Sequence, residues 1–259
     1  MGLGRFSSPQ PDGAMPVIRV HERDFDVDVV VFDKDGTLVD LDSSWGPMAR
    51  SWVAAVAGDD DGLIHDLSDT LGLDLVTGRL VPDSTFAAGT LGLAGDVTRD
   101  LLLAAGWSLH GVEAALERAR TEVDAAVART VPVTLADVGL IFTRLAARGV
   151  KIAIFTSDDR GPTVRFLEQV GVLELVSVAI TADDVEYPKP HPDGLHRIGQ
   201  AMGCPADRIV LVGDSMADQN AARAAGAWFI AVGHGTAAAA GSDATVSSID
   251  EVGVGSALR

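Results

Sequence analysis

The sequence predicts an α/β fold: a doubly wound, Rossmann-like parallel sheet that carries an all-helical insert. Two observations support this prediction. From residue 131 onward, short apolar strands alternate with helical patterns, which is typical of a parallel sheet covered by helices on both faces. Residues 43–130 are instead rich in Ala, Leu, Gly and Asp and lack long β-branched runs, so they favour helices alone.

The insert divides the core of the predicted fold into two segments. We expect a core domain made of residues 17–42 and 131–259 and a helical cap domain made of residues 43–130. Residues 1–16 are rich in Gly, Ser and Pro and are expected to form a flexible leader. A length of 259 residues suits one large domain with a second, smaller one.

The core elements follow from their residue types. Runs of Val, Ile and Phe predict strands, whereas helical patterns that stop at a glycine predict helices. The expected strands are residues 17–20, 27–32, 151–155, 176–180, 208–212 and 228–232. The expected helices are residues 164–170, 193–202 and 217–225, one that is capped by Thr134 and runs to residue 148, and a surface helix at 237–240 capped by Thr236.

The insert shows helical spacing of its apolar residues. Its expected helices are residues 44–56, 84–91, 97–105 and 112–128. The last is the clearest, because Ala, Leu and Val recur at helical spacing among charged positions. The acidic run at residues 59–61 is expected to be a solvated loop.

The composition of the chain excludes some classes of binding partner. A net charge of −17 argues against binding to a nucleic-acid backbone, which requires basic patches. No apolar run reaches the roughly 18 residues of a membrane span, and no signal peptide is recognisable. The single cysteine, Cys204, suits a reducing compartment. We therefore expect a soluble, cytoplasmic monomer or homodimer with no nucleic-acid or membrane partner.

The end of the first long strand is the most informative stretch of the chain. There an apolar run gives way to Asp33-Lys34-Asp35-Gly36-Thr37. Alternate residues along a strand point the same way, so Asp33 and Asp35 can face one small volume while Lys34 points elsewhere. Two crowded carboxylates repel each other. A cation, a shared proton or a reaction that uses both acids would offset that repulsion.

Polar residues also follow three later strands of the predicted sheet. They are Thr156 and Ser157 after the next core strand, Lys189 beyond the strand after it, and Asp214 and Asp218 after the fourth. Because parallel strands end at one edge of their sheet, we expect these residues to converge. Acids, hydroxyls and one of only three lysines suit a Mg²⁺ ion and a phosphoryl group.

These motifs resemble those of the haloacid-dehalogenase (HAD) superfamily of phosphatases. The stretch from Asp33 is similar to the family's nucleophile motif, Thr156 to its hydroxyl motif, Lys189 to its lysine motif, and the stretch from Asp214 to Asp218 to its acidic motif. All four occur in the family's order. The helical insert lies between the first and second motifs, where the family places its C1 cap. The whole pattern is most similar to the phosphoglycolate-phosphatase type.

The resemblance implies roles for the acids. Asp33 would attack phosphorus and form an aspartyl-phosphate. Asp35 would protonate the leaving alkoxide and then deprotonate the hydrolytic water. Mg²⁺ would be bound by the Asp33 carboxylate, the Asp35 backbone carbonyl and Asp214. Asp218 would lie behind these ligands or reach the metal through water.

The resemblance also implies how phosphate would be held. Thr156 and the Ser157 amide would bind phosphate oxygens, and Lys189 would neutralise Asp33 and the phosphoryl group. The implied activity is Mg²⁺-dependent hydrolysis of a small phosphorylated metabolite. Arg50, Arg79 and Thr85 of the insert are candidates for choosing the leaving group, because an anionic group needs a guanidinium or another donor.

Other branches of the family differ at identifiable positions. Dehalogenases lack the second acid of the first motif, so Asp35 favours phosphoryl chemistry. P-type ATPases carry a similar motif, but without an acid at that position and with membrane segments. Phosphonatases need a lysine in the cap, and residues 43–130 contain none. A sugar phosphomutase and a catalytically silent, phosphate-binding regulatory protein on the same fold stay as alternatives.

Overall fold

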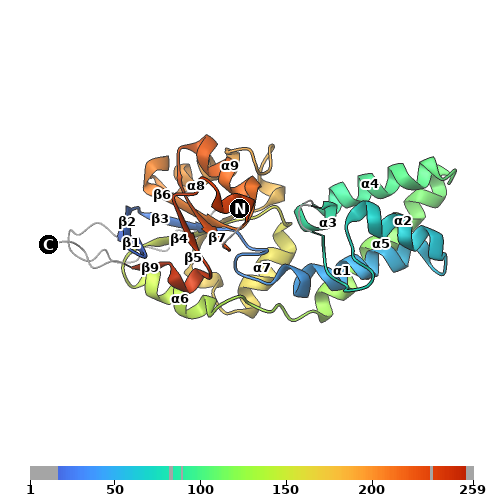
Figure 1. Ribbon diagram of the computed structural model, residues 1–259, viewed down its shortest axis with the longest axis horizontal. Coiled ribbons are helices and arrows are strands. Elements are labelled where there is room, and N and C mark those ends of the chain that lie inside the picture. The colour runs from blue at the N-terminus through green and yellow to red at the C-terminus, as the bar shows by residue number, and fades with distance from the viewer. Residues whose placement is uncertain (1–16, 82–83, 89, 234–235, 255–259) are drawn as a thin grey trace.

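The computed structural model describes residues 17–81, 84–88, 90–233 and 236–254, so the expected leader lies outside the described residues. A six-stranded parallel sheet, in the order β5-β4-β3-β6-β7-β8, forms the core (Figure 1). Its strands are β3 (Val29–Phe32), β4 (Lys151–Phe155), β5 (Val176–Ile180), β6 (Ile209–Gly213), β7 (Trp228–Val232) and β8 (Ala244–Val246). The predicted doubly wound sheet is confirmed, with an additional edge strand, β8.

Both faces of β3 are buried, which explains its unbroken apolar run. The helices that cover the sheet are α6 (Val138–Ala146), α7 (Arg160–Gln169), α8 (Asp193–Met202) and α9 (Met216–Ala225). Val30 and Phe32 share an apolar cluster with α6 and α7, whereas Val29 and Val31 share one with α8 and α9. The alternation of side chains along β3 therefore supplies both layers of the core.

The described residues of the insert after β3 fold into helices, as predicted. They are α1 (Leu41–Ala57), α2 (Asp61–Leu71), α3 (Thr85–Ala88), α4 (Leu91–Ala104) and α5 (Leu109–Arg129). Their apolar side chains form a cluster of their own, apart from those on the sheet. At its centre Trp52 is fully buried, and its indole N–H donates to Thr98 Oγ1 at 3.0 Å. Figure 1 shows this unit projecting from one end of the core, with α7 between the two.

Helix α2 is absent from the sequence prediction. Asp60, in the expected solvated loop at residues 59–61, is its N-cap, and the Asp60 carboxylate accepts from the Leu63 N–H at 3.0 Å. The prediction of a loop is therefore wrong for Asp61, which is the first residue of α2. Consecutive acids are typical of a solvated turn, but an acid is also favoured at a helix N-terminus, where backbone N–H groups lack partners.

Two other helix starts differ from the prediction. Asp137, rather than Thr134, caps α6 and accepts from the Leu140 N–H at 2.9 Å, while Thr134 forms a backbone bridge with Val39. The single helix expected at 84–91 ends early as α3. A new helix, α4, then starts behind Thr90, whose hydroxyl caps it. In both places the polar side chain nearest to a free backbone N–H group decides where the helix begins.

A second, three-stranded sheet joins the two ends of the described chain. It consists of β2 (Arg23–Asp26), β1 (Val17–Val20) and β9 (Gly253–Val254), in that order and with antiparallel pairing. Only β1 is predicted. The remaining elements are short 3₁₀ turns: η1 (Leu173–Leu175), η2 (Ala182–Asp184), η3 (Ala206–Arg208), η4 (Ala237–Ala239) and η5 (Ile249–Glu251). Thr236 caps η4 as expected, although η4 is not an α-helix.

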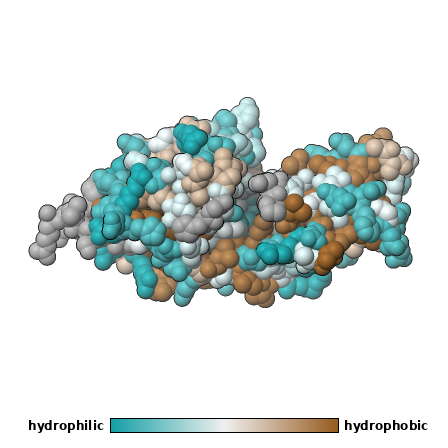
Figure 2. All heavy atoms as spheres, viewed as in Figure 1, coloured by the Kyte–Doolittle hydropathy of each residue, from teal (hydrophilic) through white to brown (hydrophobic). Residues whose placement is uncertain are grey.

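The surface of the described residues carries both apolar and polar side chains. Figure 2 shows apolar residues over the cap helices and along the lower edge of the molecule, among polar ones. Val131 and Val133, in the segment that returns from α5 to the core, are exposed apolar residues. Within the described ranges, no helix combines the length and the apolar character that a membrane crossing requires.

Candidate active site

The polar strand ends meet at one edge of the sheet. Phe32 of β3 pairs in register with Ile154 of β4 on one side and with Val212 of β6 on the other. Asp33 therefore lies between the segments that carry Thr156 and Asp214. Its own backbone N–H donates to the Val212 carbonyl at 2.9 Å, which continues the strand pairing into the motif. The convergence expected for parallel strand ends is present here.

Three carboxylates gather at this edge. Asp33, Asp214 and Asp218 each offer one oxygen, and these oxygens lie within 4.8 Å of one another. Asp33 and Asp218 are buried, with 6% and 1% of their surfaces exposed. Asp218 is placed by the first turn of α9, where it forms a capping box with Ser215. The cluster therefore rests on two strand ends and one helix start, which are rigid supports.

Gly36 allows the first loop to close against Asp214. Gly36 has a φ of +82°, and a Cβ atom at this position would lie 2.2 Å from Asp214 Oδ2. Only glycine fits both conditions. The next residue, Thr37, donates from its hydroxyl to Asp214 Oδ1 at 3.2 Å. Gly36 and Thr37 of the first motif thus serve to hold the acid of the fourth motif.

Lys189 supplies the positive charge among these acids. Its Nζ lies 2.6 Å from Asp33 Oδ1 and 2.6 Å from Asp218 Oδ1, and 3% of its side chain is exposed. It follows η2 in the loop after β5, and its peptide bond to Pro190 is cis. The ammonium therefore bridges the acid after β3 and the acid in α9, and its role toward a phosphoryl group stays a prediction.

The electrostatics of the cluster show an excess of negative charge. Burial raises the pKa of Asp33 well above its ordinary value, and Asp218 and Asp214 raise it further, against the opposing effect of Lys189. Burial and Asp218 raise the pKa of Asp214 to about 7. Burial alone would lower the pKa of Lys189, but Asp218 and Asp33 outweigh it and raise the pKa. One ammonium does not compensate three carboxylates in a buried volume.

This donor set fits a divalent cation. Carboxylate oxygens are hard ligands of the kind that Mg²⁺ takes, and Mg²⁺ is held in proteins by one or two carboxylates together with waters. Burial and the neighbouring acids raise the pKa of both Asp33 and Asp214, and a bound cation would oppose this rise. Asp33 and Asp214 belong to the metal ligands expected from the sequence, and an Asp218 oxygen lies within 4.8 Å of an oxygen of each.

Thr156 and Ser157 follow β4, on the other side of Asp33. Thr156 is buried, and its backbone N–H donates to the Ile180 carbonyl at 3.0 Å. Its hydroxyl oxygen accepts from the Asp158 N–H at 3.1 Å. Ser157 is partly exposed. The loop after β4 therefore brings both residues to the edge that carries Asp33, and their role as phosphate ligands stays a prediction.

Asp35 occupies a different environment from Asp33. Its carboxylate lies beside the ammonium of Lys34, with Asp35 Oδ2 at 2.6 Å from Lys34 Nζ. The hydroxyl of Ser44, in the first turns of α1, donates to Asp35 Oδ1 at 3.4 Å. Asp35 is therefore held at the junction between core and cap, whereas Asp33 is held among Lys189 and the other acids.

Two buried charges in this region were not predicted from the sequence. Asp158 is 7% exposed, and its Oδ2 lies 3.1 Å from Lys34 Nζ. Burial would lower the pKa of Lys34, but Asp35 and Asp158 raise it by more, so Lys34 is a cation. The scarcity of lysine is the one signal that could have marked Lys34, because nothing in the sequence links it to Asp158.

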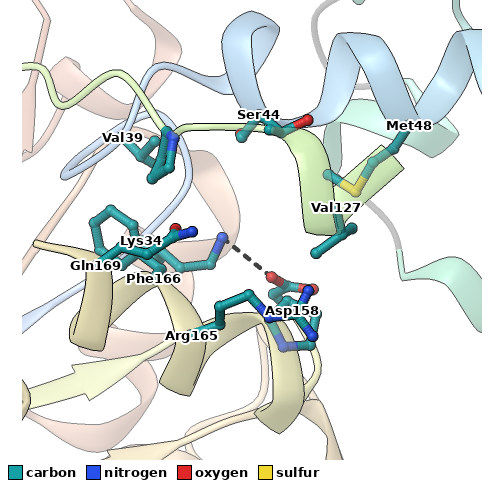
Figure 3. Close-up of a pocket in the computed structure, with 12 residues that line it drawn as sticks. Lys34, Val39, Ser44, Met48, Val127, Asp158, Arg165, Phe166 and Gln169 are labelled. Atoms are coloured by element: carbon teal, nitrogen blue, oxygen red, sulfur yellow. Dashed lines mark ion pairs between the residues drawn. The ribbon is translucent and has the colours of Figure 1, made fainter. Parts of the chain in front are cut away.

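A small cavity adjoins this ion-paired group. Its volume is about 50 Å³, and it lies where the core meets the first and last helices of the cap (Figure 3). Figure 3 shows Lys34 and Asp158 turned toward each other, with Ser44, Met48 and Val127 approaching from the cap side. A cavity of this size holds a few water molecules.

Of the three residues named as specificity candidates, the two arginines are engaged by other residues of the cap. Arg79 pairs with Asp42 at 2.7 Å and is 73% exposed. Arg50 donates to the Gly78 carbonyl at 2.9 Å. Thr85 is the first residue of α3 and is partly buried. The role of these three residues in specificity stays a prediction.

Comparison with known proteins places these motifs in a family context. The family model of haloacid dehalogenase-like hydrolases matches residues 27–226. A phosphoglycolate phosphatase of Rhodospirillum rubrum is 29% identical over 195 residues, which cover 70% of this chain and 80% of that protein. A phosphoglycolate phosphatase of Escherichia coli K12 is 37% identical over 82 residues, which cover 32% of each protein.

Solved structures with the same arrangement support the fold. A predicted phosphoglycolate phosphatase from Haemophilus somnus has a TM-score of 0.65 at 18% identity, covering 85% of this chain and 93% of that one. CbbY from Rhodobacter sphaeroides, in complex with phosphate, has a TM-score of 0.61 at 18% identity, covering 88% and 96%. At such identities the likeness concerns the core and its helical insert, and not the substrate.

Proposed function

Because this chain belongs to the haloacid dehalogenase-like hydrolases, we propose that it is a Mg²⁺-dependent phosphatase of small phosphorylated metabolites. The observation that carries the proposal is the buried cluster in which Asp33 meets Lys189, Asp214 and Asp218. A nucleophilic carboxylate beside an ammonium and further acids suits attack on a phosphoryl group whose charge must be offset.

Asp33 is the nucleophile of the proposed reaction. One of its oxygens attacks phosphorus, the bond from phosphorus to the leaving oxygen breaks, and an aspartyl-phosphate forms on Asp33. Asp35 in its carboxylic acid form donates a proton to the leaving alkoxide and becomes a carboxylate. Asp35 then takes a proton from water, which attacks phosphorus, breaks the bond to Asp33 and releases inorganic phosphate. The two acids of the first motif therefore have separate roles, in keeping with their separate environments.

The remaining residues hold the phosphoryl group and its charge. Lys189 neutralises Asp33 and one phosphoryl oxygen, and the Thr156 hydroxyl and Ser157 amide donate to the others. Asp33, Asp214 and the Asp35 carbonyl would hold Mg²⁺, with Asp218 beside them. When bound, Mg²⁺ supplies positive charge that stabilises the equatorial oxygens during transfer. The helical cap would exclude water from the site.

Phosphoglycolate is the substrate that we propose to test first. The support is the similarity to phosphoglycolate phosphatases, at 29% identity over most of the chain. A cap without any lysine leaves arginines and hydroxyls to recognise an anionic leaving group. Substrate choice would then depend on Arg50, Arg79 and Thr85 after a movement of the cap, because Arg50 and Arg79 are engaged within the cap in this structure.

A panel of phosphomonoesters tests the proposed function. Phosphate release from phosphoglycolate and from sugar phosphates is measured with Mg²⁺, with EDTA, and with Asp33→Asn. We expect release that depends on Mg²⁺ and disappears in Asp33→Asn, together with a phosphorylated Asp33 peptide after a rapid acid quench. Activity that survives EDTA or Asp33→Asn would refute the mechanism. Isomerised sugar phosphate without free phosphate would indicate a mutase, and phosphate binding without turnover a silent regulatory protein.

A further inference from the structure

Lys34 and Asp158 are buried charges to which the proposed mechanism assigns no task. Only 5% of each side chain is exposed. The Lys34 ammonium lies between two carboxylates, with Nζ at 2.6 Å from Asp35 Oδ2 and at 3.1 Å from Asp158 Oδ2. It also lies 5.9 Å from the centre of the Phe166 ring, so that apolar surface borders the pair (Figure 3). Burial makes these ion pairs sensitive to geometry.

Both ends of this ion-paired group are fixed by backbone contacts. The Lys34 carbonyl accepts from the Leu38 N–H at 2.9 Å and from the Val39 N–H at 3.1 Å, which closes the first loop on itself. The Asp158 carboxylate accepts from the Asp159 N–H at 2.8 Å, and the Asp158 N–H donates to Thr156 Oγ1 at 3.1 Å. Lys34 thus links the loop that carries Asp35 to the loop that carries Thr156.

We propose that Lys34, held in place by Asp158, is a positioning residue that fixes the carboxylate of Asp35 for proton transfer. The proposal rests on the proposed phosphatase function. The Lys34 ammonium holds Asp35 Oδ2, and Ser44 approaches Asp35 Oδ1 from the cap at 3.4 Å, so the carboxylate is fixed where core and cap meet. A leaving group that faces the cap would meet the acid there.

Two observations argue against simpler roles for Lys34. The Lys34 ammonium is buried and already paired with the Asp35 and Asp158 carboxylates, so it is not free to bind substrate. Stability alone does not require the charges either, because well-packed apolar residues often replace a buried ion pair without loss. A lysine pinned between two acids in the nucleophile loop is better explained by the orientation of Asp35.

The test uses the leaving group to isolate the proton donated by Asp35. Phosphoglycolate, or the best alkyl phosphate of the panel above, releases an alkoxide that needs this proton. p-Nitrophenyl phosphate releases a phenolate that leaves without it. The parameter kcat/KM reports the steps up to the first chemical step, in which the leaving group departs. The ratio of kcat/KM for the alkyl substrate to that for the aryl substrate therefore measures proton donation.

Three variants of the proposed group are compared with wild type. Asp35→Asn removes the acid and sets the lower limit of the ratio. Lys34→Met removes the ammonium but leaves Asp158 buried and unpaired. The double variant Lys34→Met/Asp158→Asn leaves no unpaired charge at position 158, so it keeps the test valid if the single variant is unstable. General acid catalysis contributes about 100- to 10,000-fold, and misplacement of a catalytic group can forfeit much of it.

A matched control is available at the opposite edge of the sheet. Arg208 also lies between two acids, with Nη2 at 2.8 Å from Asp28 Oδ1 and Nη1 at 2.5 Å from Asp26 Oδ1, and its side chain is 14% exposed. It precedes β6, whereas Asp214 follows that strand. Arg208→Met should lower the melting temperature and leave the ratio unchanged, which separates general destabilisation from the orientation of Asp35.

We expect the ratio to fall at least about tenfold in Lys34→Met and in the double variant, in the direction of Asp35→Asn. A ratio that stays at the wild-type value in the double variant overturns the inference, whatever its melting temperature. Different results would refute the proposed function itself: wild-type protein that releases no phosphate, or activity that survives Asp33→Asn. An unchanged ratio in Asp35→Asn would refute the acid role of Asp35 and the inference with it.

Discussion

Gly36 shows how closely the candidate site depends on one small residue. Its φ is positive, and a Cβ atom there would lie only 2.2 Å from Asp214 Oδ2, which leaves no room for a side chain. The loop that carries Asp33 and Asp35 can therefore close over Asp214 only with glycine there. The same closeness places the Thr37 hydroxyl on Asp214. A residue without chemistry of its own thus sets the spacing of the acids.

Gly36→Ala should weaken Mg²⁺ binding as well as stability. The strain of a positive φ costs about 1–3 kcal/mol, and the added methyl group also displaces the Asp214 carboxylate. Gly149→Ala is the control, because Gly149 has a φ of +77° and a Cβ there meets no atom within 4 Å. Both variants should unfold at lower denaturant concentration. Only Gly36→Ala should lose Mg²⁺ affinity by calorimetry, and equal affinity in the two would contradict the steric argument.

The raised pKa of Asp214 predicts a pH-dependent metal affinity. Without metal, its carboxyl has a pKa of about 7, so protons compete with Mg²⁺ below that pH. One competing proton weakens binding about tenfold between pH 8 and pH 6. The stability of the metal-free protein changes with pH in the opposite direction to the metal affinity. Because the folded pKa lies above the ordinary 3.8, the metal-free protein loses stability as pH rises from about 4 to 7.

Calorimetric titration with Mg²⁺ from pH 6 to pH 8, in buffers matched for ionic strength, checks this dependence. Denaturant unfolding in EDTA over pH 4 to 7 checks the sign of the stability change. An affinity that does not change between pH 6 and pH 8 would show that Asp214 is ionised throughout, or that it does not bind the metal.

At the scale of elements, the sequence patterns predict the parallel sheet because each strand is an apolar run bounded by turn residues. They also predict that the motif residues converge, because strand ends share an edge. The three-stranded sheet could not be predicted, because β9 has two residues and pairs with β1, which lies near the other end of the described chain. The pairing of Lys34 with Asp158 could not be predicted either, because it depends on a contact between segments that are distant in the sequence.

Helix α2, which the sequence patterns did not predict, can be tested directly. Asp60→Ala removes the N-cap hydrogen bond to the Leu63 N–H and should destabilise α2 by about 1 kcal/mol. Asp59→Ala changes the same charge one residue earlier and should stay within about 0.5 kcal/mol. Amide hydrogen exchange in α2 measures the difference. Equal exchange in the two variants would show that the cap does not stabilise the helix.

At the scale of the whole molecule, the chain has separate apolar clusters in the core and in the cap. The cap cluster draws on α1 to α5, and the two sheet clusters draw on the strands and on α6 to α9. The proposed phosphoryl site belongs to the sheet edge, while Asp35 contacts α1 through Ser44. This division suits a rigid catalytic core with a cap that can open without disturbing Asp33, Lys189 or Asp214.

Leu116→Ala and Leu145→Ala should reveal this division. Both leucines are fully buried, Leu116 in the cap cluster and Leu145 in a sheet cluster, and each change should cost about 2–5 kcal/mol. If the clusters unfold separately, Leu116→Ala speeds hydrogen exchange in α1 and α5 but not in β3 and β4, and Leu145→Ala does the reverse. Mg²⁺ should then slow exchange in β3 and β6 of both variants without restoring the cap of Leu116→Ala, because the proposed ligands lie in the core. Faster exchange throughout the chain in both variants would instead show that core and cap unfold as one cooperative unit.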